Sequence, residues 1–202
     1  MKLAKKLYLA SSNPGKLKEF LSIANVAAAG MALELLPDFA KLTPFPEDAP
    51  TFAENASGKA LHASAITEDA VCADDSGLIV PALGGEPGVH SARYAGKRAT
   101  GTENIAKLLN ALQGLSGNQR AAYFVCALAV ARKGRMLAVI TNRVDGEILN
   151  EPHGTGGFGY DPVFYFPSFG KTFAELSGDE KNLHSHRGKA FRRLLDVLPA
   201  ML

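Results

Sequence analysis

The chain has 202 residues, of which 47% are hydrophobic and 21% are charged. This length corresponds to one domain, and this composition excludes disordered, collagen-like and coiled-coil proteins. Lysine and arginine number 22 and aspartate and glutamate 20, which leaves a formal charge of +2. So small a charge excludes a general attraction to nucleic acid or anionic membranes, and any anion must bind at a local site.

The first half of the chain alternates short apolar runs with helical patterns. The turn Ser11–Gly15 precedes a helix, because Leu17, Phe20 and Ala24 recur at helical spacing. A second helix opens at the capping box Thr51-x-x-Glu54 and extends to about Thr67. The strands that we predict in this half are Lys6–Ala10, Leu33–Leu36 and Ala70–Ala73.

A long β-hairpin dominates the second half. Ala121–Arg132 and Met136–Val144 are strands joined by a turn at Gly134, and Gly146 is expected to kink or turn the second strand. A short aromatic strand follows at Pro162–Phe166. The interleaved strands and helices predict an α/β fold with a mixed, twisted central sheet and flanking helices.

Two further capping boxes mark helices in this half. Thr100-x-x-Glu103 opens a helix before the hairpin, and Ser177-x-x-Glu180 opens a last helix. The apolar stripe that we predict for the last helix consists of Leu183, Ala190, Phe191, Leu194, Leu195 and Leu198.

The cysteines and the N-terminus bear on the compartment. Cys72 and Cys126 each lie inside an apolar run, and we interpret them as buried thiols, because a zinc site needs more ligands at closer spacing. The basic N-terminus precedes only the short apolar stretch Leu7–Ala10, which is too short for a signal peptide, and no run approaches the ~18 residues that span a bilayer. We therefore expect a cytoplasmic, soluble protein without membrane or nucleic-acid partners.

The first candidate site is the turn between the first strand and the first helix. A helix N-terminus presents unpaired backbone N–H groups and a partial positive charge, which attract phosphate. This turn is not a Walker A loop, because Leu17 follows the lysine where that loop has serine or threonine. A plain helix cap is an equally consistent interpretation. The residues concerned are Ser11, Ser12, Asn13, Pro14, Gly15 and Lys16.

Acidic residues provide a second candidate site. Asp74 and Asp75 follow a buried strand, and their carboxylates point to opposite sides if strand geometry persists. Carboxylates at a strand end are well placed to hold Mg²⁺. The alternative is an Asp-rich turn. Glu47 or Asp48 in the loop 44–50, or Glu54 after it, would complete a metal site with Asp75, although solvated or capping acids are the simpler interpretation of each.

A glycine-rich segment and the last helix provide candidates for binding a flat ligand. Glycines flank two aromatics in Phe158-Gly159-Tyr160-Asp161, and an aromatic face stacks on a base. A wide turn whose aromatics fill the core is the alternative. Lys181 and Ser185 share a helix face at i, i+4 spacing, and His186 and Arg187 donate hydrogen bonds to oxo groups; a solvated basic face is the alternative here.

Together these segments resemble the ITPase (RdgB-like) family of nucleoside triphosphate pyrophosphatases. The motifs run from Leu9 to Gly188 in the family's order, and the ordered set is far more specific than any one of them. They are Ser-x-Asn-x-x-Lys, Asp-Asp-Ser-Gly-Leu, Gly-Gly-x-Pro-Gly, Ser-Ala-Arg-Tyr, Gly-Thr-Gly-Gly-Phe-Gly-Tyr-Asp-Pro and Ser-His-Arg-Gly. The resemblance implies a single domain over residues 1–202, with two lobes and the active-site cleft between them.

The resemblance also implies residue roles. Ser11 to Lys16 would cradle the triphosphate, with Lys16 stabilising the leaving pyrophosphate. Asp75 would be a Mg²⁺ ligand and the general base, Glu47 the second metal ligand, and Ser76 a substrate contact. The residues implied for the base pocket are Phe158, Gly159, Tyr160, Asp161, Lys181, His186 and Arg187. The sequence departs from many relatives at Ser11-Ser12, where they have Thr-Gly.

The implied reaction is Mg²⁺-dependent hydrolysis of non-standard purine nucleotides (ITP, dITP or XTP) to the monophosphate and pyrophosphate. It would cleanse the nucleotide pool and prevent incorporation into DNA and RNA, and the implied assembly is a homodimer. A Maf-type pyrophosphatase for modified nucleotides is an alternative against which the Ser-His-Arg motif argues. A non-catalytic nucleotide-binding module is another, and Leu17 argues against a P-loop kinase.

Overall fold

The computed structural model describes residues 5–27 and 31–201, so the basic residues 1–4 lie outside the described part. The strands are β1 (Lys5–Leu9), β2 (Met31–Leu35), β3 (Ala70–Ile79), β4 (Ala121–Arg132), β5 (Arg135–Ile148), β6 (Phe164–Phe166) and β7 (Lys171–Thr172). The α-helices are α1 (Pro14–Ala27), α2 (Phe52–Ala63), α3 (Gly101–Ala111), α4 (Gly178–His184) and α5 (His186–Val197). Within these ranges, none of the helices has the length and apolarity to cross a membrane.

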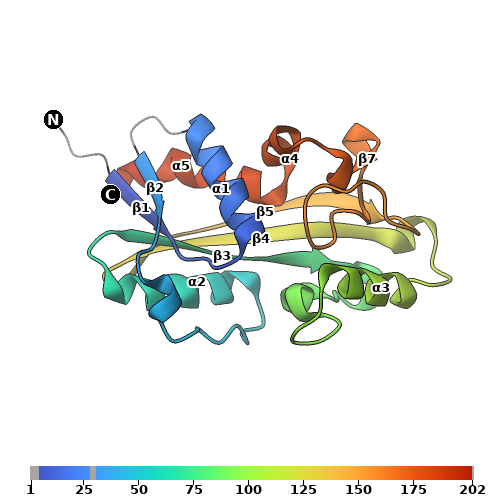
Figure 1. Ribbon diagram of the computed structural model, residues 1–202, viewed down its shortest axis with the longest axis horizontal. Helices are drawn as coiled ribbons and strands as arrows, with labels where there is room; N and C mark the ends of the chain where they lie inside the picture. The colour runs from blue at the N-terminus through green and yellow to red at the C-terminus, as the bar shows by residue number, and fades with distance from the viewer. Residues whose placement is uncertain (1–4, 28–30, 202) are drawn as a thin grey trace. The chain divides into compact units, whose positions relative to one another are not determined.

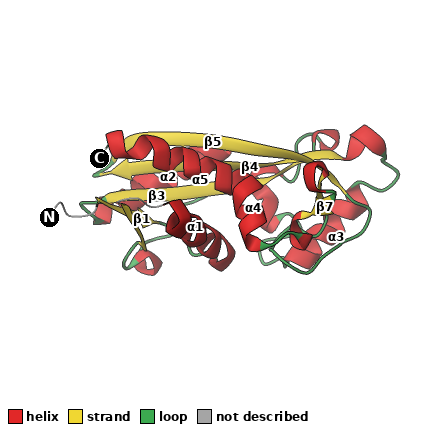
Figure 2. Cartoon of the chain, turned by 90° about the horizontal axis from the view of Figure 1, so that it is seen from above, coloured by secondary structure: helices red, strands yellow, loops and turns green. Residues whose placement is uncertain are grey.

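The strands of the described residues form one sheet in the order β2-β1-β3-β4-β5-β6-β7. β1 pairs in parallel with β2 and β3, whereas β6 pairs antiparallel with β5 and β7. Figure 2 shows β3, β4 and β5 as long strands running alongside one another. The predicted mixed α/β architecture is therefore confirmed.

The chain divides into two compact units. Unit 1 comprises Met1–Asp75, Cys126–Asn142 and Arg187–Leu202, and unit 2 comprises Ser76–Val125 and Arg143–His186. In unit 1, α1 and α5 cover one face of the strands and α2 covers the other (Figure 1).

Each unit has its own apolar core. In unit 1 the centroids of the Phe20 ring of α1 and the Phe191 ring of α5 lie 5.2 Å apart. The same core contains the free, buried thiols of Cys72 and Cys126. In unit 2, Phe164 packs 4.6 Å from Phe124 and 4.9 Å from Phe173 between ring centroids. The helix patterns predicted from the sequence supply the apolar faces of both cores.

β3 differs from its prediction. The structure continues this strand without interruption through Asp74–Gly77, so the two aspartates lie inside a strand and not at its end. β3 has hydrogen-bonded neighbours on both sides, β1 and β4. β1 pairs only with Ala70–Cys72, so at Asp74–Gly77 the neighbouring strand is β4. Pairing with β4 satisfies backbone groups that a turn would satisfy locally, and it overrides the turn preference of Asp and Gly.

Gly146 does not turn the chain, because β5 continues through it from Arg135 to Ile148. A Cβ atom at this position would collide with the backbone oxygen of Tyr165 and the ring of Phe164 on β6. The glycine therefore permits the close approach of a neighbouring strand and does not turn its own.

The predicted last helix is two helices. Ser185 adopts an extended conformation with ψ of 160° and ends α4, and α5 begins at His186. The Ser177 capping box is present, but the helical phase is lost at the break, so Leu183 is 57% exposed and not part of the buried stripe. Ser185 still donates its backbone N–H to the Lys181 carbonyl oxygen at 2.8 Å, and both residues are buried, so the break follows the predicted i, i+4 pair.

Arg120 is the main buried polar connection in unit 2, and it is 8% exposed. Its guanidinium donates to the carbonyl oxygens of Ile148 at 2.6 Å and Leu149 at 2.7 Å, where β5 ends. It also donates to Leu112 at 3.0 Å, which follows α3. One side chain thus joins the end of α3 to the start of the loop 149–163.

Replacing this guanidinium should destabilise the protein. We expect Arg120→Leu to lower the free energy of unfolding by about 3 kcal/mol, because it leaves several buried carbonyl groups without donors. Arg98→Leu, at an exposed arginine of the same unit, should change it by less than about 0.5 kcal/mol. Urea unfolding at 25 °C measures both values, and equal effects of the two substitutions would contradict this role.

Candidate active site

The turn after β1 forms the N-terminus of α1, as predicted. The Asn13 side-chain oxygen accepts hydrogen bonds from the backbone N–H groups of Gly15 at 3.0 Å and Lys16 at 3.1 Å. The Ser11 hydroxyl accepts from the Asn13 N–H at 3.3 Å. The helix is therefore capped by its own asparagine, and Ser12, Asn13 and Pro14 are exposed at the tip of the turn.

Lys16 faces the sheet from this helix. Its ammonium lies 2.8 Å from Asp74 Oδ2, and the Asp74 side chain is 2% exposed. Burial raises the pKa of Asp74, but the ammonium groups of Lys16 and Lys59 and the Arg187 guanidinium together hold it below its usual value. Asp74 stays ionised and fixes the lysine that the sequence assigns to phosphate binding.

Lys59 of α2 is a site residue that the sequence analysis missed. Its ammonium donates to the Asp74 carbonyl oxygen at 2.5 Å and lies 3.7 Å from Asp75 Oδ1. The same ammonium lies 3.3 Å from Glu47 Oε1. The structure thus brings the predicted pair Asp75 and Glu47 to one cation. The spacing of Lys59 from Asn55, one helical turn, is the signal that would have placed it on this face.

Asp75 is poised between opposing influences. Burial raises its pKa above the ordinary value, and the nearby Glu47 carboxylate acts in the same direction. The ammonium groups of Lys59 and Lys16 act against this shift. The two aspartates therefore differ in their electrostatics although they are neighbours, because Asp75 has the weaker cationic support.

The other acids do not join this group. The Thr51 hydroxyl donates to Glu54 Oε2 at 2.7 Å, so Glu54 serves as the cap residue of the simpler interpretation. Asp48 is exposed. Across residues 5–27 and 31–201, no three His, Cys, Asp or Glu side chains cluster closely enough to hold a metal on their own. A Mg²⁺ ion needs only one or two protein carboxylates when substrate phosphates complete its shell, and Asp75 with Glu47 fits that requirement.

In unit 2, the glycine-rich loop and α4 meet at a buried ion pair. Lys181 Nζ lies 2.6 Å from Asp161 Oδ2, and both side chains are at most 6% exposed. The Phe158 N–H donates to the same carboxylate oxygen at 2.7 Å, and the Lys181 ammonium lies 4.8 Å from the centroid of the Phe158 ring. The loop therefore presents an aromatic face beside a cation.

Tyr160 belongs to the core and not to this group. Its hydroxyl donates to the Ser91 carbonyl oxygen at 2.9 Å, and the residue is 4% exposed. Burial raises the pKa of its phenol above the ordinary value. The Tyr160 ring therefore fills the core, and a substrate contact by this residue stays a prediction.

The Ser-His-Arg motif is divided between the units. The His186 ring stacks on Phe124 with centroids 4.7 Å apart and planes 10° apart, within unit 2. Arg187 belongs to unit 1, where its Nη1 lies 3.0 Å from Glu19 Oε2 of α1. Ser76, the predicted substrate contact, is partly exposed on β3.

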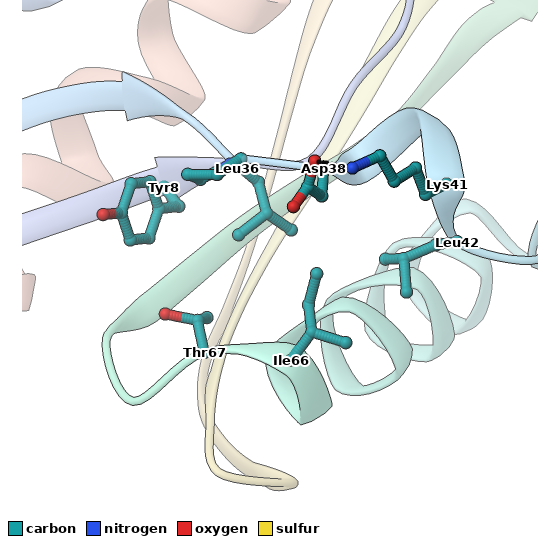
Figure 3. Close-up of a pocket in the computed structure, with 8 residues that line it drawn as sticks. Tyr8, Leu36, Asp38, Lys41, Leu42, Ile66 and Thr67 are labelled. Atoms are coloured by element: carbon teal, nitrogen blue, oxygen red, sulfur yellow. Dashed lines mark ion pairs between the residues drawn. The ribbon is translucent and has the colours of Figure 1, made fainter.

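Two surface pockets are lined by none of the residues that the sequence assigned to a site. The pocket in Figure 3, of about 330 Å³, lies in unit 1, and the Asp38–Lys41 ion pair is at its rim. Its lining residues are Tyr8, Leu36, Pro37, Asp38, Lys41, Leu42, Ile66 and Thr67. A pocket of about 300 Å³ in unit 2 is lined by Glu86, Pro87, His90, Arg93, Tyr94 and Lys107.

Comparison with known proteins identifies the family. The model of the Ham1 family matches residues 7–197. The chain belongs to the Ham1 family. A dITP/XTP pyrophosphatase of Geobacillus kaustophilus is 52% identical over 190 residues, covering 94% of this chain and 92% of the relative. One of Thermus thermophilus is 48% identical over 192 residues, covering 95% and 91%.

Solved Ham1 structures share the fold. The HAM1 protein of Coxiella burnetii superposes with a TM-score of 0.86 at 40% identity, covering 97% of this chain and 99% of that one. The Ham1 protein of Staphylococcus aureus gives 0.84 at 38% identity, covering 97% and 99%. The resemblance inferred from the ordered motifs is confirmed.

The buried ion pair of this Ham1 chain can be tested by a double-mutant cycle. Lys181→Met should lower the free energy of unfolding by about 3 kcal/mol, because it leaves the Asp161 carboxylate buried without its cation. Adding Asp161→Asn should recover part of that loss, since no uncompensated charge then remains. Urea unfolding of the three variants gives the coupling, and strictly additive losses would rule out the pairing.

Proposed function

We propose that this Ham1 protein hydrolyses the non-standard purine nucleotides ITP, dITP and XTP to the monophosphate and pyrophosphate. In the cell this reaction would remove these nucleotides before they enter DNA or RNA. The observation that carries the proposal is the convergence of Asp75 and Glu47 on the Lys59 ammonium, with Lys16 held nearby by Asp74. The names of the curated relatives, dITP/XTP pyrophosphatase, support the same activity.

Asp75 would act as the general base. A carboxylate whose pKa is raised by burial is a stronger proton acceptor than a solvated one, which suits the removal of a proton from an attacking water. The water would attack the α-phosphorus in line with the leaving pyrophosphate. Lys59, between Asp75 and Glu47, would hold the base in its ionised form before the reaction.

Lys16 and Lys59 would supply positive charge to the phosphates. The charge that develops on the leaving pyrophosphate is stabilised by fixed cations and by backbone N–H groups at a helix N-terminus. The Ser11 and Ser12 hydroxyls at the tip of the α1 turn add uncharged donors. Because Asn13 already accepts from two N–H groups of this turn, Lys16 would be the principal anion ligand here.

We further propose Mg²⁺ as the cofactor, held by Asp75 and Glu47 together with substrate phosphates. When bound, Mg²⁺ would neutralise phosphate charge and make water easier to ionise. Carboxylate oxygens are the ligands that Mg²⁺ prefers. The Asp75 and Glu47 carboxylates already lie beside the same ammonium group, that of Lys59.

The purine would bind at the cluster in unit 2. The Phe158 ring offers a stacking face, and the Lys181 ammonium is a donor suited to a 6-oxo group. Adenine presents an amino group at that position and would leave a buried donor unpaired, which allows discrimination of about 10⁴-fold. His186 and Arg187 remain proposed base contacts; Arg187 would exchange its Glu19 partner for the base. A cytoplasmic homodimer is proposed on the family resemblance.

The reaction can be tested with a panel of ITP, XTP, dITP, GTP, ATP, dTTP and CTP, with pyrophosphate and orthophosphate measured separately. We expect pyrophosphate from ITP, dITP and XTP alone, and only with Mg²⁺. Asp75→Asn should lower kcat by at least about 100-fold while the protein stays folded, because the swap is nearly isosteric. Release of orthophosphate in place of pyrophosphate would contradict the proposal. Hydrolysis of all the nucleotides at similar rates would favour a Maf-like or unselective site. No hydrolysis of any nucleotide would favour a non-catalytic binding module.

The assignment of the second carboxylate has a matched test in the same loop. Glu47→Gln should raise the Mg²⁺ concentration for half-maximal rate by about 10-fold or more, because a carboxylate ligand is lost. Asp48→Asn, at the exposed neighbour, should leave it unchanged. A Mg²⁺ titration of both variants decides between the two acids, and the reverse ranking would move the role to Asp48.

A further inference from the structure

The loop that carries Glu47 has few ways to hold itself in place. It contains Pro44, Pro46 and Pro50, and proline has no N–H to donate. Ala49, two residues after Glu47, is one of the few positions where both backbone groups are available. A loop of this composition needs anchors from outside to fix a carboxylate.

Asn55 supplies such an anchor from the first turn of α2. Its side chain is fully buried, at 0% exposure. The Asn55 Oδ1 accepts from the Ala49 N–H at 3.1 Å, and its Nδ2 donates to the Ala49 carbonyl oxygen at 3.3 Å. The side-chain amide thus pairs with both backbone groups of Ala49, as a neighbouring strand would.

The Asn55 amide also acts on the Asp75 carboxyl group. Interaction with the Asn55 amide lowers the pKa of the Asp75 carboxyl, against the effect of burial. An amide NH₂ group has two donors, so one hydrogen serves Ala49 and the second is available to a neighbouring acceptor. No apolar residue and no carboxylate offers this combination of one acceptor and two donors.

Two more contacts extend along the same face of α2. The Phe45 ring lies against Gly58 so closely that a Cβ atom there would collide with it. The His62 Nε2 donates to the Thr43 carbonyl oxygen at 2.8 Å. Asn55, Gly58 and His62 follow each other at i, i+3 and i+7, so one helix face holds the loop at successive turns.

From these contacts we infer that Asn55 is a positioning residue, which fastens the loop 44–50 to the face of α2 that lies beside Asp75 and so sets the separation of the Glu47 and Asp75 carboxylates. The inference rests on the proposed roles of those two acids. Lys59, one helical turn after Asn55, contacts both acids, with its ammonium 3.3 Å from Glu47 Oε1 and 3.7 Å from Asp75 Oδ1.

The chain offers a matched control. Thr100-Gly-Thr-Glu103-Asn104 repeats the Thr-x-x-Glu-Asn pattern of Thr51–Asn55 in unit 2. Asn104 is 5% exposed, accepts from the Ala95 N–H at 2.7 Å and donates to the Ala92 carbonyl oxygen at 3.3 Å. Asn104→Ala removes a clamp of the same kind from a loop that carries none of the proposed catalytic carboxylates.

The experiment compares Asn55→Ala with Asn104→Ala by amide hydrogen exchange and by kinetics with ITP. We expect similar losses of thermal stability. Only Asn55→Ala should lose the protection of the Ala49 amide, lower kcat by about 10-fold or more and raise the Mg²⁺ requirement, with KM for ITP changed less than about 3-fold. Equal kinetic effects of the two substitutions, or an Ala49 amide still protected, would overturn the positioning role.

A second variant covers the case in which Asn55→Ala does not fold. Gly58→Ala improves helix propensity and displaces Phe45, so it should loosen the loop without weakening α2. Faster exchange of the loop amides with a lower kcat supports the inference, and an unchanged kcat with a loosened loop overturns it. The exchange measurements need no substrate, so an inactive wild-type protein would refute the proposed function alone, while the exchange data would still decide whether Asn55 holds the loop.

Discussion

Two adjacent aspartates inside a buried strand are the constraint on which unit 1 depends. Burying a single charged carboxylate costs desolvation free energy, and burying two adjacent ones would destabilise the fold severely without cations on both sides of the sheet. The strand sends Asp74 toward Lys16 of α1 and Asp75 toward Lys59 of α2. The helices α1 and α2 therefore contribute one lysine each, so the packing of these two helices also balances the charge of the strand.

The sequence predicted the elements whose pattern is local. The helix after Ser11–Gly15, the helix starts at Thr51, Thr100 and Ser177, and the hairpin all follow from spacing within a few residues, and the structure contains them. The predictions from the sequence were wrong where pairing or packing with a neighbouring element decides the local conformation. The strand through Asp74–Gly77 depends on its pairing with β4, and at Gly146 the close approach of β6 requires a residue without a side chain.

The candidate site follows the same division. Lys16, Asp75 and Glu47 were identifiable from motifs, because each lies in a segment whose composition is unusual by itself. Lys59 and Asn55 were not, since they lie on an ordinary-looking amphipathic helix and acquire meaning only when the loop 44–50 packs on it. Tyr160 adds a role that its motif did not indicate, because its buried ring fills the core and its hydroxyl donates to the Ser91 carbonyl oxygen.

The two buried thiols on β3 and β4 have a practical consequence. Cys72 and Cys126 lie on the neighbouring strands β3 and β4, and burial raises the pKa of both, so each remains a protonated, unreactive thiol in the folded protein. A thiol reagent can reach them only during transient opening of the core that supports Asp74 and Asp75. The rate at which a thiol reagent modifies Cys72 and Cys126 therefore reports the free energy of local opening in this part of the molecule, and no engineered cysteine is needed.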